Sequence, residues 1–193
     1  MGFLTKQEIE KIGFKKIGDN VLISDKASIY NAGAISIGSY VRIDDFCLLS
    51  AGKAGINIGN FVHMSVYSSL MGAELITLED FVGISSKVSV YSSSDDYMGY
   101  GMTNPIVPEE FTNVKSMAVT LKKHSLVGAH SVLLPGSVLG CGVSIGAMSV
   151  VSSVLEDWFV YMGNPVKKIV RRSKKLLEKE KKLKDNFKHV NFN

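Results

Sequence analysis

The chain has 193 residues, 46% of them hydrophobic, and this length and composition suit one folded domain with a short appendage and exclude a disordered chain. No run of about 18 apolar residues is present, so no membrane span is expected. The charged N-terminus lacks the apolar stretch of a secretory signal, and we expect a cytoplasmic protein.

The net charge of +4 is unevenly distributed, because the residues from Pro165 onward include eleven Lys or Arg against three acids. Such an end is typical of a solvated helix face, of a phosphate-binding tail or of a subunit-docking tail. Nucleic acid is not an expected partner, since no base-stacking aromatics interleave the charges.

Residues 1–16 are expected to cap the rest of the chain. A helix is predicted from Leu4 to Gly13, because Thr5 can cap it and Glu8 completes a capping box three residues later. Gly13 is a natural C-terminal stop. This helix would close the open end of the repeat that follows.

Residues 17–155 carry a six-residue repeat, which is most regular from Leu121 to Ser153. Five consecutive blocks there open with an aliphatic residue and have a compact or β-branched residue in fifth place. The fifth places are Ser125, Ser131, Ser137, Val143 and Ser149. A period of six fits neither a helix nor a plain strand. It fits an all-β solenoid in which three blocks make one triangular coil.

The repeat is interrupted over residues 92–118, a segment that includes Asp95 and Asp96. A loop of about 25 residues inside a compact repeat is uncommon and usually functional. After the repeat, residues 156–193 are expected to form a C-terminal cap, with a basic helix from Val166 to about Lys188. Its apolar residues would form a packing face.

The two cysteines are expected to be unpaired. Cys47 falls on the fifth place of a block and should be buried, and Cys141 lies near a coil corner. No metal-binding spacing is present.

The hexads, the interrupting loop and the closing Gly163–Ile169 stretch (GNPVKKI) resemble the hexapeptide-repeat acyltransferases, in particular the bacterial sugar O- and N-acetyltransferases. The resemblance implies a left-handed parallel β-helix, acetyl-CoA as co-substrate and no metal. It also implies a homotrimer with the acetyl-CoA groove between neighbouring prisms, and a sugar or nucleotide-sugar acceptor.

The resemblance also implies where the donor binds. Gly128-Ala129 and Gly146-Ala147 match the glycine-small pairs whose backbone lines the pantetheine arm, and their spacing of 18 residues stacks them in one column. The column extends backwards to Ser85 and then to Ser65. At its other end, a turn at Pro165 precedes cations that would meet the CoA phosphates: Lys167, Lys168, Arg171 and Arg172. Helix solubility would also account for these cations.

Members similar to galactoside acetyltransferase carry their catalytic histidine in the interrupting loop, which here has none. His189 falls in the tail, and His124 and His130 take outward places of their blocks. His63 instead lies beside Ser65, at the far end of the donor column.

We hypothesise that His63 is the general base, because the ordinary pKa of imidazole, about 6.5, suits proton transfer near neutral pH. A surface histidine on a repeat corner is the alternative. Asp95 or Asp96 could orient His63 or bind the acceptor, although turn chemistry explains these two aspartates equally well.

We predict an acetyl-CoA-dependent acetyltransferase that moves an acetyl group directly to the amino group of a nucleotide-linked amino sugar, for lipopolysaccharide O-antigen or capsule synthesis. An amine asks less of its base than a hydroxyl does, which fits the loss of the loop histidine. The alternatives are O-acetyl transfer to a sugar hydroxyl and a non-catalytic hexapeptide-repeat binding protein. A hydratase of the γ-carbonic anhydrase type needs three zinc-binding histidines, whose spacing His63, His124 and His130 do not reproduce.

Overall fold

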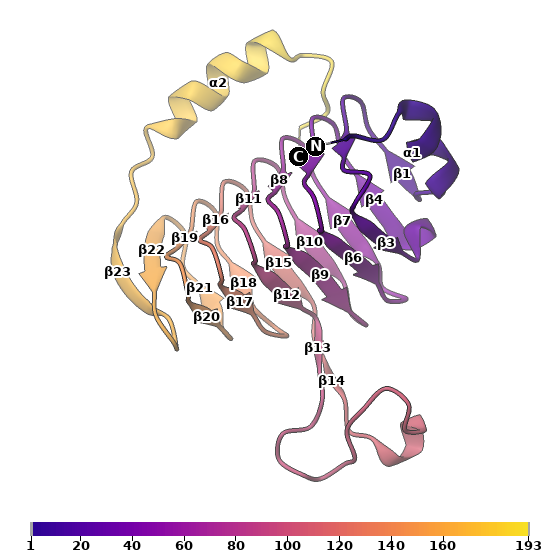
Figure 1. Cartoon of the computed structure of the whole chain (residues 1–193). Helices are drawn as coiled ribbons and strands as arrows, with labels where there is room; N and C mark the ends of the chain where they lie inside the picture. Colours follow the sequence, from indigo (N-terminus) through magenta and orange to yellow (C-terminus); the bar gives the residue numbers. More distant parts are fainter. Residues whose placement is uncertain (1, 193) are drawn as a thin grey trace.

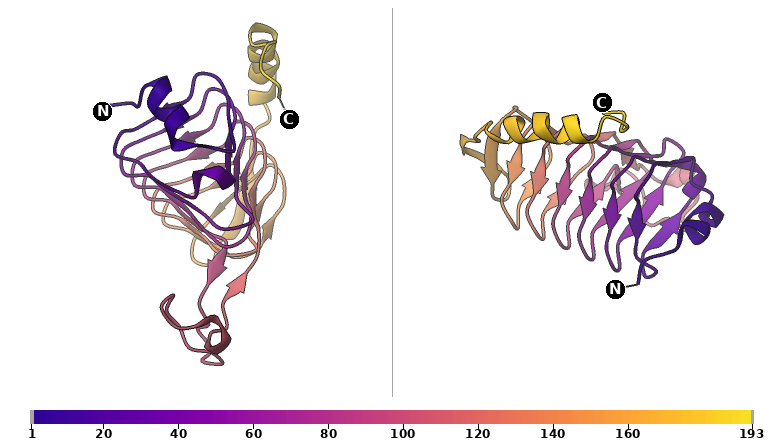
Figure 2. Two further views of the ribbon diagram at one scale, coloured as in Figure 1. Left: turned by 90° about the vertical axis from the view of Figure 1, so that its right-hand side faces the viewer. Right: turned by 90° about the horizontal axis from the view of Figure 1, so that it is seen from above.

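A computed structural model describes residues 2–192. The first residue of the predicted segment 1–16 and the last residue of the predicted segment 156–193 therefore lie outside the described residues. The chain winds into a three-sided parallel β-helix, with one helix at its N-terminal end and one beside it (Figure 1). The view along the prism shows the triangular coils, with the interrupting loop leaving one corner (Figure 2).

Each side of the prism is one sheet, numbered here by its order in a coil. The first sheet contains β1 (Lys16–Ile17), β4 (Ile35–Ile37), β7 (Ile56–Ile58), β10 (Ile76–Leu78), β15 (Val119–Leu121), β18 (Val138–Leu139) and β21 (Val154–Leu155). The second contains β2 (Leu22–Ile23), β5 (Arg42–Ile43), β8 (His63–Met64), β11 (Gly83–Ile84), β16 (Leu126–Val127), β19 (Ser144–Ile145), β22 (Phe159–Met162) and β23 (Lys167–Arg171). The third contains β3 (Ser28–Tyr30), β6 (Leu48–Ala51), β9 (Ser69–Gly72), β12 (Ser89–Tyr91), β17 (Val132–Leu133) and β20 (Val150–Val151).

The hexad pattern accounts for the core. Its opening aliphatic residues point inward, and the three faces meet in one continuous hydrophobic cluster. The fifth-place serines are buried, and their hydroxyls donate to nearby backbone carbonyls. Ser149 Oγ, for example, lies 2.7 Å from the carbonyl oxygen of Gly146. Serine fits this place because it is compact and its one polar group is satisfied locally.

The N-terminal helix α1 (Lys6–Ile12) has the predicted capping box. Thr5 donates its backbone N–H to Glu8 Oε2 at 2.7 Å, and Glu8 N–H donates to Thr5 Oγ1 at 3.3 Å. Gly13 ends the helix with a φ of 80°. A short 3₁₀ turn, η1 (Ala32–Ala34), follows in the first coil.

The interrupting loop projects from the corner between the third and first sheets (Figure 1). Its base is an antiparallel pair, β13 (Ser93–Ser94) with β14 (Lys115–Ser116), and it contains a 3₁₀ turn, η2 (Glu109–Phe111). In a triangular coil this corner is opposite the second sheet.

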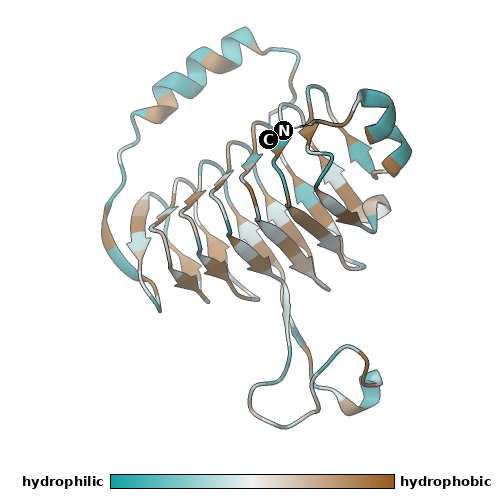
Figure 3. Ribbon diagram, viewed as in Figure 1, coloured by the Kyte–Doolittle hydropathy of each residue, from teal (hydrophilic) through white to brown (hydrophobic). Residues whose placement is uncertain are grey.

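The prediction of one basic helix from Val166 to about Lys188 is wrong. Lys167–Arg171 form β23, which pairs antiparallel with β22, and helix α2 spans only Leu176–Asn186. The last coil would otherwise expose an unpaired strand edge, and pairing it outweighs the local preference for helix. Figure 3 shows α2 as largely hydrophilic.

Residues 187–192, which follow α2 and are called the C-terminal tail here, cover the corner between the first and second sheets. There a column of residues with left-handed backbone stacks its rings, as Tyr40 on Phe61 with centroids 4.8 Å apart and Phe61 on Phe81 at 5.3 Å. Phe192 stacks on the same rings, and Val190 is buried.

Two histidine predictions are therefore corrected. The His124 side chain is only 10% exposed, because α2 packs over it, and His189 bonds to the Tyr40 hydroxyl at 3.0 Å rather than lying in a frayed end. His130 is exposed, as predicted.

Candidate active site

The outward-facing residues of the second sheet form one column along the prism. In order they are Leu22, Arg42, His63, Gly83, Leu126, Ser144 and Val160, each paired with the next across neighbouring strands. Gly83 has no side chain, so a gap opens between His63 and Leu126. This gap is part of a hollow of about 290 Å³, whose walls also include Ser65, Ser85 and Ala129.

The predicted donor column lies beside this hollow. Ser85 N–H donates to the Val127 carbonyl at 3.0 Å and Gly128 N–H to the Ile145 carbonyl at 2.8 Å, so Ser65, Ser85, Gly128 and Gly146 stack on successive coils. Three coil spacings of about 4.8 Å make this column about 14 Å long. The predicted stacking is confirmed. The end of the column formed by Ser65 and Ser85 opens into the hollow.

The packing of the coils themselves requires glycine at position 128. A Cβ atom there would lie 2.5 Å from the Ala147 nitrogen and 2.7 Å from the Ile145 carbonyl oxygen. At Gly146 a Cβ would meet the Met162 side chain at 2.9 Å. Close stacking of coils is thus a sufficient reason for Gly128, besides the approach of a ligand.

His63 is held by a buried carboxylate that the sequence analysis did not identify. Its Nε2 lies 2.9 Å from Asp44 Oδ2, and Arg42 Nε donates to Asp44 Oδ1 at 2.7 Å. The Asp44 side chain is 6% exposed, whereas His63 is half exposed. Burial raises the pKa of Asp44, but hydrogen bonds from Arg42 and His63 outweigh it and leave this pKa below its usual value. With Asp44 ionised, Nε2 donates this hydrogen bond, and Nδ1 is the ring nitrogen left for other partners.

The two loop aspartates differ sharply. Asp96 is buried, and its carboxylate accepts hydrogen bonds from the backbone of Met98, Tyr100 and Gly101 and from Asn113 Nδ2. These bonds, led by the one from Met98, lower its pKa. Asp96 therefore organises the loop. The Asp95 side chain is exposed, and its carboxylate accepts no hydrogen bond from residues 2–192.

The cations predicted to bind phosphate lie beyond the other end of the donor column. They are on or directly after β23, which pairs with β22, the strand next to Gly146. Lys168 pairs with Glu156 at 2.5 Å and lies over the Phe159 ring, as does Arg171, while Lys167 is exposed. Pro165 follows a cis peptide bond in the turn before them. Arg172 instead donates to the backbone carbonyls of His124 and Gly142, a structural role.

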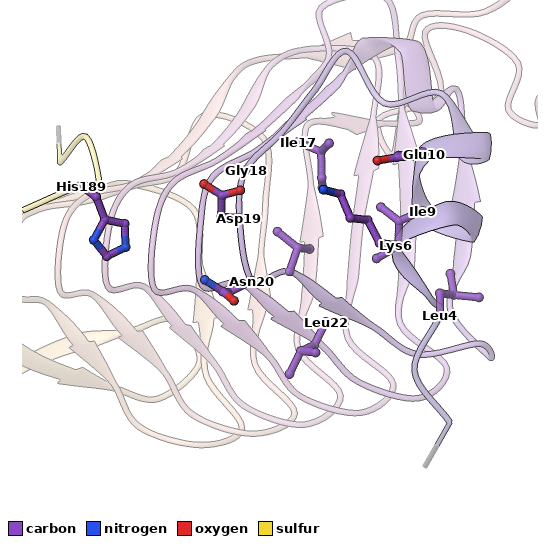
Figure 4. A pocket seen from close by; sticks show the side chains of 11 residues that line it. Leu4, Lys6, Ile9, Glu10, Ile17, Gly18, Asp19, Asn20, Leu22 and His189 are labelled. Carbon is purple, nitrogen blue, oxygen red and sulfur yellow. The ribbon is translucent and has the colours of Figure 1, made fainter. Parts of the chain in front are cut away.

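A second hollow, of about 590 Å³, lies between α1 and the first coil, with His189 of the tail on its wall (Figure 4). A third, of about 700 Å³, runs along the first sheet beneath the tail. No residue of the donor column lines either of them. Neither hollow therefore belongs to the candidate donor site.

Three further findings bear on the sequence predictions. Cys47 is buried, burial raises the pKa of its thiol to about 11, and both cysteines are unpaired. Within residues 2–192, no cluster of His, Cys, Asp and Glu side chains has an arrangement that could hold a metal ion. No helix in the same part of the chain has the length and hydropathy needed to cross a bilayer.

Two functional candidates, Asp44 and Gly83, were missed from the sequence. Gly83 had a signal, since it occupies the sixth place of its hexad, where the neighbouring coils have His63 and Leu126. Asp44 had none, because its contact with His63 depends on how two coils stack.

No family model matches the chain. The chain is 49% identical over 180 residues to the dTDP-4-amino-4,6-dideoxy-D-glucose acyltransferase of Escherichia coli, an alignment that covers 93% of this chain and 94% of the relative. It is 28% identical over 147 residues to WbbJ of Escherichia coli K12, to which lipopolysaccharide O-acetyl transfer is provisionally assigned, with 72% of each chain covered.

Among solved structures, the N-acyltransferase AntD of Bacillus cereus, in complex with dTDP and 3-hydroxybutyryl-CoA, superposes with a TM-score of 0.91. Its sequence is 46% identical, and the match covers 96% of this chain and 98% of AntD. Another AntD structure, also 46% identical, holds dTDP-4-amino-4,6-dideoxyglucose and coenzyme A and superposes with a TM-score of 0.92 over the same shares of the two chains.

This fold and these relatives define a left-handed β-helix acyltransferase of the hexapeptide-repeat class that uses an acyl-CoA donor. Within that class, the chain belongs to the family of the dTDP-4-amino-4,6-dideoxyglucose acyltransferases. The predicted fold, enzyme class and co-substrate are confirmed, and so is transfer to a nucleotide-linked amino sugar.

Proposed function

We propose that this protein transfers a short acyl group from coenzyme A to the 4-amino group of dTDP-4-amino-4,6-dideoxyglucose. The observation that carries the proposal is the match of 49% identity across 93% of the chain to an acyltransferase for that sugar. The donor column leading to the hollow at Ser85 supplies a matching site. The product would serve the synthesis of a bacterial surface polysaccharide in the cytoplasm.

The reaction is a direct acyl transfer. The amine nitrogen attacks the thioester carbonyl, a C–N bond forms and the C–S bond breaks. The sugar nitrogen gives up one proton to a base, and coenzyme A leaves as the thiolate and takes up a proton. The protein must therefore hold the thioester, support the carbonyl oxygen as it becomes an oxyanion, and accept the proton.

The donor extends along the second sheet from β23 to the hollow. Gly128, Ala129, Gly146 and Ala147 face the pantetheine arm, and the turn at Pro165 brings Lys167, Lys168 and Arg171 near the CoA phosphates. The column length of about 14 Å suits an extended arm. The thioester then lies at Ser85, whose hydroxyl has no hydrogen-bond partner among residues 2–192 and is available to the oxyanion.

The enzyme works as a homotrimer with each site between two subunits. Asp95 lies on the loop between the third and first sheets, at the corner opposite the second sheet that carries the hollow of its own chain. The loop also exposes large apolar side chains that a neighbouring prism would cover. Those exposed by half or more are Tyr97, Met98, Tyr100, Met102, Ile106, Phe111, Val114 and Met117. Cyclic symmetry places one loop at each neighbouring hollow.

Asp95 is the proposed base. Its carboxylate is unengaged, whereas that of Asp96 is occupied by the loop backbone. AntD structures have been solved with substitutions at a serine and at an aspartate ten positions after it. Ser85 and Asp95 have the same spacing. We therefore assign the oxyanion contact to Ser85 and proton acceptance to Asp95 of the neighbouring subunit.

His63 is a second candidate base, favoured by its place in the wall of the hollow and by its bond to Asp44. Replacing His63 by Gln keeps the shape of the wall and removes the imidazole. If turnover is lost in His63→Gln but not in Asp95→Asn, the proton goes to His63 and not to Asp95.

The function is tested by following thiol release from acetyl-CoA with dTDP-4-amino-4,6-dideoxyglucose and identifying the product by mass. We expect stoichiometric thiol and a sugar nucleotide heavier by one acetyl group. The matched control acceptor is a dTDP-linked hexose with a hydroxyl at C4, which should give no product. Acetylation of the hydroxyl sugar alone would instead establish O-acetyl transfer.

A further inference from the structure

The glycine at position 83 has no structural reason to be a glycine. It is not among the residues with left-handed φ, and a Cβ built there would meet only the flexible end of Leu126, at 3.0 Å from Cδ1. Gly128, one coil further on, is different because a Cβ there would collide with backbone. The scaffold would thus tolerate a small side chain at position 83.

What the glycine does provide is space. It is the single residue without a side chain in the outward column from Leu22 to Val160, and the hollow of about 290 Å³ opens at its position. The walls on either side are His63 and Leu126, and Leu126 is 43% exposed. The exposed Leu126 side chain therefore forms an apolar boundary of the gap.

This gap also lies at the reactive end of the donor column. Gly83 begins strand β11 and Ser85 directly follows the end of that strand, with Ile84 buried in the core between them. A thioester at Ser85 therefore has its acyl carbons within reach of the Gly83 gap and the Leu126 side chain.

We infer that the gap at Gly83 is the acyl-chain pocket of the donor, and that Gly83 and Leu126 set the length of acyl group the enzyme accepts. The inference rests on the proposed function and deepens it. The pocket has room beyond an acetyl group, so donors such as propionyl-CoA and butyryl-CoA are substrates as well. The related AntD has been solved in complex with 3-hydroxybutyryl-CoA, so a member of the family binds an acyl-CoA with a longer chain than acetyl.

The test compares kcat/KM for acetyl-, propionyl- and butyryl-CoA in the wild type and in Gly83→Ala and Gly83→Val. Each side-chain carbon added at position 83 should fill part of the gap and so reduce the space left for the acyl chain of the donor. Because one methylene in an apolar pocket changes specificity about 10–200-fold, we expect Gly83→Val to raise the preference for acetyl over butyryl at least tenfold. Leu126→Ala should shift the preference towards the longer donors.

Ser144→Val is the matched control, because it places the same valine side chain in the same outward column, at a residue that does not line the hollow. It should leave the ratio among the three donors unchanged. An equal loss for all three donors in Gly83→Val, or no change in their ratio, would overturn the inference.

Binding separates this inference from the proposed function. If the wild type acylates no dTDP-amino sugar, the proposed function fails. The dissociation constants of butyryl- and acetyl-CoA, measured by calorimetry in the wild type and in Gly83→Val, then test the pocket alone. Selective weakening of butyryl-CoA supports the pocket, and equal affinities for the two donors in both proteins refute it.

Discussion

Gly83 and Gly128 are both outward or corner positions of the second sheet, yet their neighbourhoods give them different tasks. Gly128 is required by the close stacking of two coils, whereas Gly83 leaves the wall of the hollow open. We predict that Gly128→Ala lowers the free energy of unfolding by about 1–3 kcal/mol, the usual cost of overpacking. Gly83→Ala should stay within about 0.5 kcal/mol of the wild type. Denaturant unfolding of both variants checks this, and equal losses would contradict it.

The adjacent aspartates of the loop form a second contrast at the scale of single residues. Asp95→Asn should lower kcat by about 10²–10⁴-fold, the usual contribution of a general base, with unchanged thermal stability. Asp96→Asn should instead loosen the loop, because the neutral amide is a poorer acceptor for four hydrogen bonds. Limited proteolysis within residues 97–113 measures that loosening. Faster cleavage in Asp95→Asn than in Asp96→Asn would reverse the two assignments.

At the scale of elements, helix α2 is fastened to the prism by one carboxylate. Glu180 is 11% exposed and lies 2.7 Å from Lys123 Nζ, 2.8 Å from His124 Nε2 and 2.9 Å from Lys184 Nζ. Burial raises its pKa, but these three donors outweigh it and lower the pKa from 4.5 to about 2. That difference corresponds to roughly 3 kcal/mol of anchoring.

Because the anchored carboxylate has the lower pKa, the anchoring is complete above about pH 4.5 and is lost as the pH falls toward 2. Trp158, the single tryptophan, reports on this contact, since Lys174 Nζ lies 5.4 Å from its ring. We predict that Glu180→Gln changes Trp158 fluorescence at neutral pH and abolishes its change between about pH 5 and pH 2. Glu178→Gln, an exposed residue of the same helix, is the control and should behave as the wild type.

The elements also show what the sequence could and could not predict. The prism follows from the hexads because each block carries its own inward aliphatic residue, so the pattern is local. The helix predicted at Val166 was wrong because β23 is set by the free edge of β22, which a local pattern does not contain. His124 was misplaced for the same reason, since the helix that covers it lies 56 residues further along the chain.

The candidate site divides in the same way. The donor column could be predicted from an 18-residue spacing, because equal spacing places residues on the same face of successive coils. The Asp44–His63 contact could not, since it depends on side chains that meet across coils of unequal length. Nor does the sequence show which aspartate of the loop is free, because that depends on how the loop folds back on Asp96.

At the scale of the whole molecule, the proposed homotrimer would divide each active site between two chains. In the proposed homotrimer, one chain would supply the donor column and the hollow on its second sheet, and the next would supply Asp95 on a loop that leaves the opposite corner. A single prism holds both halves but cannot bring them together. Activity should therefore depend on assembly of the trimer. Within each neighbouring pair, one chain must have an intact hollow and the other an intact Asp95.

Mixing two inactive variants tests this most directly. Asp95→Asn keeps the hollow and removes the proposed base, whereas Ser85→Trp blocks the hollow and keeps the proposed base. When equal amounts are unfolded and refolded together, about one interface in four combines the two intact halves in a cyclic trimer. Thiol release should then recover to about a quarter of the wild-type rate. A mixture no more active than its parents, although mass measurements show mixed trimers, would contradict the shared site.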